Sequence, residues 1–178
     1  MAVIPDLATR LRELIREVPD FPTSGIRFQD ITPLLADPVA FAGVVEAIGA
    51  QYGRGAVDKV VGIEARGFIL AAPVAYHLGA GFVPVRKHGK LPAATLDADY
   101  ALEYGTATLE VHRDAFGPGD RVLIVDDVLA TGGTAAAAAG LVERAGGQVL
   151  GVSVLLELRT LEGRRALPAS NVHALLSI

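Results

Sequence analysis

The sequence of 178 residues contains no cysteine and no tryptophan, and only 6% of its residues are aromatic. Without a thiol, the chain cannot form disulfides, use a thiol nucleophile, or hold an iron–sulfur cluster or a cysteine-ligated zinc ion. It has no run near the roughly 18 apolar residues that indicate a membrane-spanning helix, so we expect no membrane partner. Its histidines, at positions 77, 88, 112 and 173, show no spacing typical of metal ligands.

A basic excess is also missing, because 16 Lys and Arg residues stand against 20 Asp and Glu residues, for a net charge of −4. Proteins that bind nucleic acid or anionic membranes usually carry the opposite balance, so we expect no nucleic-acid partner. The first 16 residues mix charged with apolar positions and lack the continuous apolar core of a signal peptide. A cytoplasmic location is the resulting expectation.

The composition that is present, 51% hydrophobic and 20% charged, is typical of a globular protein. At about 150 residues per domain, the length predicts a single domain over residues 1–178. Residues 5–18 and 38–52 show helical periodicity, and residues 21–33 are rich in turn formers and are expected to be irregular.

Beyond residue 53, short apolar runs typical of strands alternate with helical segments. The predicted strands cover residues 59–64, 81–86, 121–125 and 148–158, and the predicted helices cover residues 67–78 and 133–145. This alternation is typical of βαβ units, so we expect an α/β fold with a mainly parallel sheet flanked by helices. Between two of these units, residues 87–113 are polar and are predicted to form a loop followed by antiparallel strands.

The segment with the clearest chemistry is residues 122–134, VLIVDDVLATGGT. An apolar strand ends in Asp126 and Asp127, and a loop of small residues then leads into a helix. The loop glycines let backbone amides approach a phosphate, and the helix N-terminus adds partial positive charge. A phosphate cradle beside two hydrogen-bond acceptors suits a sugar phosphate, with the phosphate on Ala130–Thr134 and the hydroxyls on the carboxylates.

Other phosphate-binding motifs are absent from the sequence, including G-x-x-x-x-G-K-[ST] and G-x-G-x-x-G. The structural alternative is an ordinary turn with a capping threonine and solvated aspartates. Two acids at the end of a buried strand are costly without partners, which disfavours that alternative.

VLIVDDVLATGGT resembles the phosphoribosyl-pyrophosphate signature of the type I phosphoribosyltransferases. Four more segments occur in the order seen in the adenine-specific members of that family, and the similarity covers about residues 18–165. These segments are FPTSGIRFQDITPLL (21–35), EARGF (64–68), VRKHGKLP (85–92) and LEYG (102–105). The resemblance implies the type I phosphoribosyltransferase fold, with a base-binding hood in residues 1–35 and a flexible flap in residues 87–104.

The implied reaction is purine salvage, in which a Mg²⁺-dependent transferase moves the 5-phosphoribosyl group from phosphoribosyl pyrophosphate to adenine, giving AMP and pyrophosphate. By this resemblance Asp126 and Asp127 hold the ribose hydroxyls directly or through Mg²⁺-bound water, and Glu103 is the acid/base at the purine N7. The Glu64–Gly67 turn is expected to contain a non-proline cis peptide bond. The family is commonly a homodimer, with the basic arm near the neighbouring subunit.

The remaining roles also come from the resemblance. Pyrophosphate is expected to bind four cationic side chains, and adenine to bind the hood with Phe28 stacking on the purine and Val128 on its other side. The sequence departs from the common pattern at Arg27, Gln29 and Val128. The pyrophosphate residues are Arg66, Arg86, Lys87 and Lys90; the adenine residues are Ile26, Arg27, Phe28 and Val128; Tyr104 belongs to the flap.

Two other functions remain to be weighed. A transferase that uses the same donor with guanine, hypoxanthine, xanthine, uracil or orotate would differ in the hood segment, which here favours adenine. A regulator that senses phosphoribosyl pyrophosphate would carry a DNA-binding domain and a basic face, and the length and net charge disfavour both. The intact acids, phosphate loop and Glu103 argue against an inactive family member.

Overall fold

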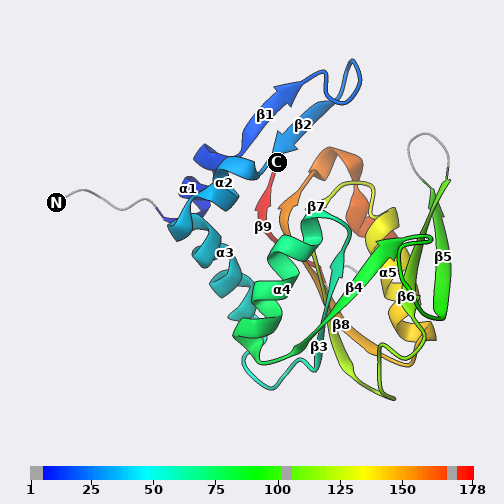
Figure 1. Ribbon diagram of the computed structural model, residues 1–178. Coiled ribbons are helices and arrows are strands. Elements are labelled where there is room, and N and C mark those ends of the chain that lie inside the picture. The colour runs from blue at the N-terminus through cyan, green and yellow to red at the C-terminus, as the bar shows by residue number, and fades with distance from the viewer. Residues whose placement is uncertain (1–5, 102–105, 168–171) are drawn as a thin grey trace.

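Strands and helices alternate from Lys59 onward, as the sequence predicts, in a computed structural model that describes residues 6–101, 106–167 and 172–178 (Figure 1). The helices are α1 (Leu7–Leu14), α2 (Thr32–Ala36), α3 (Pro38–Gly49), α4 (Arg66–Leu78) and α5 (Gly133–Arg144), with short 3-10 helices η1 (Arg159–Leu161) and η2 (Gly163–Ala166). The strands are β1 (Arg16–Pro19), β2 (Arg27–Asp30), β3 (Lys59–Ile63), β4 (Gly81–Lys87), β5 (Thr95–Ala101), β6 (Thr106–His112), β7 (Arg121–Leu129), β8 (Gln148–Glu157) and β9 (Val172–Ser177).

Seven of these strands form one sheet in the order β5-β6-β4-β3-β7-β8-β9. The pairs from β4 through β3, β7 and β8 to β9 are parallel, while β6 and β5 add an antiparallel hairpin beyond β4. The predicted α/β fold with a mainly parallel sheet is therefore confirmed, as are the antiparallel strands after residue 87.

The central strands are buried on both faces, because alternate residues point into two separate cores. In β3, Val60 belongs to the core beneath α1–α4, and Val61 belongs to the core beneath α5. The buried side chains of α4 all lie in the first core, whereas those of α5 all lie in the second. The helix that follows β3 therefore covers one face of the sheet, and the helix that follows the neighbouring strand β7 covers the other. Ligands of α/β sheets bind at such a switch point.

The N-terminal region differs from the prediction. The helix expected over residues 5–18 ends at Leu14, because Ile15 is extended and the chain then pairs with β2, with Val18 opposite Phe28. Residues 21–33 are likewise not irregular throughout, since they contain β2 and the start of α2. In Figure 1 the two-stranded β1-β2 hairpin projects away from the main sheet above α2.

Five other elements depart from the prediction. Strand β7 continues through both aspartates to Leu129, and strand β5 occupies part of the segment predicted as a flap loop. The elements η1, η2 and β9 had no predicted counterpart. Within the described ranges, no helix is both long and apolar enough to cross a membrane.

Candidate active site

The carboxyl ends of β3 and β7 bring two distant sequence motifs together at the switch point. The EARGF turn follows β3, and its Arg66 begins α4, while Asp127 lies near the end of β7. Arg66 Nε lies 2.8 Å from Asp127 Oδ2. A side chain on Gly67 would meet Asp126 Oδ1 at 2.7 Å, so glycine allows the first turn of α4 to approach the acids. The Glu64–Ala65 peptide bond is cis, as the resemblance implied.

The two aspartates have different surroundings. Asp126 Oδ1 accepts the backbone N–H of Asp127 at 2.9 Å, and Asp127 is only 5% exposed. Burial raises the pKa of Asp126, and the adjacent Asp127 charge raises it further. Burial also raises the pKa of Asp127, but the Arg66 guanidinium offsets part of that effect. Arg66 therefore favours the ionised form of Asp127 more than that of Asp126.

Asp127 Oδ2 has an unused acceptor position. Its contact with Arg66 is an ion pair without hydrogen-bond geometry, and the buried oxygen has no hydrogen-bond partner within the described part of the chain. A buried acceptor without a donor is costly unless a ligand completes it. A sugar hydroxyl or an oxygen-preferring cation such as Mg²⁺ fits this atom chemically.

The predicted phosphate loop joins β7 to α5. Gly132 caps α5 with a φ of 84°, a left-handed conformation that glycine adopts without strain. Helix α5 starts at Gly133, so the first backbone N–H groups of this helix are free to bind an anion. Beside them is a small cavity of about 50 Å³, lined by Asp126, Val128, Leu129, Ala130, Gly132, Thr134, Ala135 and Val154.

Two of the four predicted pyrophosphate-binding cations, Arg86 and Lys90, contact Glu64 with their side chains. Its carboxylate accepts Arg86 Nε at 3.2 Å, Lys90 Nζ at 2.5 Å and the Lys87 backbone N–H at 3.1 Å. Burial alone would raise the pKa of Glu64, but these donors outweigh burial and lower the pKa to about 2. This role of Glu64 could not be predicted from the sequence, because its partners lie more than 20 positions away.

The hood places an aromatic ring beside Arg66. The Arg66 guanidinium lies 4.9 Å from the centre of the Phe28 ring, and Phe21 packs edge-on against Phe28 at 5.1 Å. Arg27 is directed elsewhere, since its guanidinium lies 3.4 Å from Glu17 on the hairpin surface. Ile26 is partly buried before β2, and Val128 packs against the core beneath α1–α4.

Some expected residues cannot be placed, and other residues enter that the sequence analysis missed. Glu103 and Tyr104 lie outside the described residues. Glu110, on β6, is buried and contacts the loop that carries Lys90. His88 is close in space to Asp97 and Glu110, with their ligand atoms within 4.8 Å of one another, a proximity that sequence spacing did not reveal.

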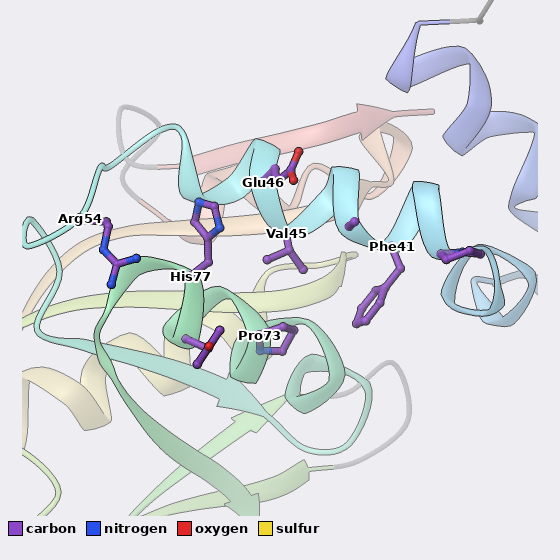
Figure 2. A pocket seen from close by; sticks show the side chains of 9 residues that line it. Phe41, Val45, Glu46, Arg54, Pro73 and His77 are labelled. Atoms are coloured by element: carbon purple, nitrogen blue, oxygen red, sulfur yellow. The ribbon is translucent and has the colours of Figure 1, made fainter.

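A larger hollow lies away from the site residues described above. A groove of about 620 Å³ separates α3 from α4, and Figure 2 shows Phe41 and Val45 of α3 facing Pro73 and His77 of α4 across it. No predicted site residue lines this groove. We therefore locate the candidate active site at the switch point and treat the groove as a separate surface.

Comparisons with known proteins agree with this geometry. The phosphoribosyl transferase domain family matches residues 34–173, and the chain belongs to this family. Adenine phosphoribosyltransferase of Acidothermus cellulolyticus is 64% identical over 173 residues, which are 97% of this chain and 98% of that protein.

Two solved adenine phosphoribosyltransferases have the same fold. The enzyme of Rhodothermus marinus is 55% identical with a TM-score of 0.92, covering 97% of this chain and 98% of that one. The enzyme of Saccharomyces cerevisiae, in complex with an iminoaltritol bisphosphate and adenine, is 40% identical with a TM-score of 0.91, covering 97% and 100%.

Proposed function

We propose that this chain transfers the 5-phosphoribosyl group from phosphoribosyl pyrophosphate to adenine, forming AMP and pyrophosphate in purine salvage. One observation carries the proposal: separate groups of acids and cations lie at the carboxyl ends of neighbouring strands. Asp126, Asp127 and the phosphate loop lie at the end of β7, and Arg86 and Lys90 lie around Glu64 beyond β3. The relatives named adenine phosphoribosyltransferase support the same reaction.

The charges suit the two fragments that form when the anomeric bond breaks. Positive charge develops on the ribose and negative charge on the departing pyrophosphate, so fixed charges that favour both would lower the barrier. Asp127 would face the ribose hydroxyls, with its unsatisfied Oδ2 as an acceptor. Arg66, Arg86, Lys87 and Lys90 would receive the pyrophosphate, and the amides of Ala130–Thr134 would hold the 5′-phosphate.

Phosphoribosyltransferases of this family generally use Mg²⁺. We propose that the ion binds mainly through substrate oxygens, with Asp126 and Asp127 holding it through water. When bound, Mg²⁺ would neutralise pyrophosphate charge and polarise the oxygens that it contacts. The chemical fit rests on Asp127 Oδ2, a buried oxygen that is ion-paired with Arg66 but accepts no hydrogen bond from the described residues.

We assign adenine to the hood, where Phe28 offers its ring and Val128 the opposing side chain. Ile26 and Arg27 would contribute backbone groups, which fits the outward pairing of the Arg27 side chain with Glu17. Glu103, with Tyr104 beside it, is the proposed acid/base at the purine N7 on family resemblance alone. Residues 1–178 would act as one cytoplasmic domain, with residues 87–104 as the flap over the reacting groups.

We further propose a homodimer formed through the outer face of α4 and the groove beside it. Tyr76 is 87% exposed, and Ile69 on the same helix and Phe82 on β4 are also exposed apolar side chains. Such a patch is typical of an interaction surface. Because β4 carries both Phe82 and Arg86, a second copy on this face would come near the basic arm. Light scattering should give twice the chain mass, and Tyr76→Glu should give monomers.

A competition assay tests the reaction. The protein is incubated with Mg²⁺, phosphoribosyl pyrophosphate and equal concentrations of adenine, hypoxanthine and guanine, and the nucleotides are separated by chromatography. We expect AMP to exceed the other products by far, because the hood segment favours adenine. If IMP or GMP predominates, the protein prefers another base and the proposed specificity is wrong. If no nucleotide forms, the proposed transfer reaction itself is refuted.

A further inference from the structure

Glu110 is one of the few buried charged residues in the described part of the chain, and the reaction outlined above gives it no role. It is 2% exposed and lies on β6, opposite Arg86 of β4 and Asp97 of β5. A buried carboxylate is costly unless several donors satisfy it. The identity of those donors therefore indicates what the residue does.

The donors of Glu110 are three consecutive backbone amides. Oε1 accepts the N–H groups of Lys90 at 2.8 Å and Leu91 at 2.7 Å, and Oε2 accepts the N–H of Gly89 at 3.0 Å. Gly89 has a φ of 82°, a left-handed conformation that turns the chain so that the amides converge on one anion. The loop after β4 is thus folded around the Glu110 carboxylate.

The three bonds favour the ionised form of the carboxyl, in which both oxygens are acceptors. Burial alone would raise the pKa of Glu110, but the amides of Gly89, Leu91 and Lys90 outweigh burial and hold the pKa below its usual range. His88 Nδ1 lies 3.7 Å from Oε2 and adds a polar neighbour on the solvent side. A glutamine here would offer one carbonyl oxygen, and its NH₂ group would face the amide donors.

The same loop also holds the two cations, because it carries Lys90 and contacts Arg86 of β4. The Lys90 carbonyl accepts Arg86 Nη1 at 3.1 Å, and the Lys90 ammonium and Arg86 Nε both contact Glu64. Glu110 therefore fixes the Lys90 peptide through its N–H, and that peptide in turn orients the Arg86 guanidinium through its carbonyl. Glu64 contacts the charged groups of Arg86 and Lys90 themselves, whereas Glu110 contacts the backbone of residues 89–91 and lies near the His88 ring.

We propose that Glu110 is a positioning residue for the pyrophosphate end of the donor. It folds residues 89–91 into the geometry that holds Arg86 and Lys90 beside Glu64. The inference rests on the proposed function of those cations. It extends that function to a residue that contacts no substrate.

Steady-state kinetics of Glu110→Gln test this role. We expect the KM for phosphoribosyl pyrophosphate and the inhibition constant of pyrophosphate to rise about 10-fold, the scale of one lost hydrogen bond to a charged group. The KM for adenine should change less than about 2-fold, a margin below 0.5 kcal/mol. Glu110→Asp, which keeps the charge, should recover part of the effect. A general loss of structure would instead affect both substrates.

Asp58→Asn is the matched control. Asp58 also accepts a backbone N–H, from Arg121 at 2.8 Å, but it precedes β3 at the opposite end of the sheet. This variant should lose stability and keep its kinetic constants. If Glu110→Gln behaves like Asp58→Asn, the proposal is wrong.

Two further measurements separate the remaining outcomes. In the wild-type protein, amide hydrogen exchange at Gly89, Lys90 and Leu91 should be slow; exchange at free-loop rates would overturn the proposal even if Glu110→Gln did not fold. Lys87→Ala tests the underlying function, since an unchanged KM for the donor would remove pyrophosphate from this loop. A raised KM in Lys87→Ala with a normal Glu110→Gln would refute the positioning role alone.

Discussion

Replacing Gly163 with alanine would press a methyl group into the phosphate loop. An ideal Cβ on Gly163 would lie 2.2 Å from the Ala130 carbonyl oxygen and 3.0 Å from the Gly132 nitrogen. Both neighbours are backbone atoms, so no side-chain rotation can relieve the contact. Segment η2 is itself fixed, because Arg164 binds Glu157 through two nitrogens, at 2.6 and 3.0 Å, and donates to the Val172 carbonyl at 2.7 Å.

The loop must therefore shift by roughly 1 Å to restore an ordinary carbon–oxygen contact near 3.3 Å. Overpacking of this kind costs about 1–3 kcal/mol of unfolding free energy. A displacement of about 1 Å in a group that positions substrate can lower activity about 100-fold. We expect Gly163→Ala to raise the KM for phosphoribosyl pyrophosphate about 10- to 100-fold, with the KM for adenine little changed.

Gly140→Ala on α5 is the matched control, because a Cβ there meets nothing within 4 Å. In a helix interior this change should stabilise the protein by about 0.5–1 kcal/mol and leave the kinetics unchanged. Urea denaturation and initial-rate kinetics on both variants give the two quantities. A Gly163→Ala protein with wild-type stability and donor KM would refute the contact between η2 and the phosphate loop.

Three other predictions address the acids, the hood and the cation cluster. Asp127→Asn should raise the KM for phosphoribosyl pyrophosphate about 10- to 100-fold in initial-rate assays, since Arg66 loses its counter-ion and a charge-assisted bond to the ribose is lost; an unchanged KM would move the ribose contacts elsewhere. Phe28→Ala should raise the KM for adenine about 10-fold and spare the donor, since it removes the aromatic face; equal effects on both substrates would contradict the stacking role. The folded-state pKa of Glu64, about 2, lies below its ordinary 4.5, so the native state binds fewer protons and stability should fall as pH drops through this window. In Glu64→Gln, the urea midpoint should therefore depend less on pH between pH 2 and 6 than it does in the wild type. An equally steep pH dependence would argue against the interactions of Glu64 with Arg86 and Lys90.

The sequence predicted the sheet better than the edges of the molecule. Strands such as Lys59–Ile63 and Arg121–Leu129 are recognisable because both faces are buried, so they are continuously apolar. The hood was misjudged because β1 and β2 stabilise each other by pairing across the seven residues between Pro19 and Arg27, which helical periodicity cannot reveal. Strand β9 was missed for the same reason, since its pairing with β8 is a tertiary contact.

The candidate site shows the same division. One continuous motif contains Asp126, Asp127 and the phosphate loop, so their chemistry can be inferred from the sequence. The roles of Glu64, Glu110 and Gly163 depend on partners 19 or more positions away, and a lone Glu or Gly carries no sign of such contacts. Arg66 is intermediate, because the turn identifies it but only the fold places it beside Asp127 and Phe28.

The most direct test of the account is a crystal structure of the protein with AMP and magnesium pyrophosphate. We predict the AMP 5′-phosphate on the amides of Thr131–Thr134, the ribose hydroxyls within hydrogen-bond distance of Asp126 or Asp127, and adenine against Phe28. Pyrophosphate should lie on Arg66 and on the cations now held by Glu64. AMP bound elsewhere, such as in the groove between α3 and α4, with the loop of residues 130–134 empty, would contradict the assignment of the site.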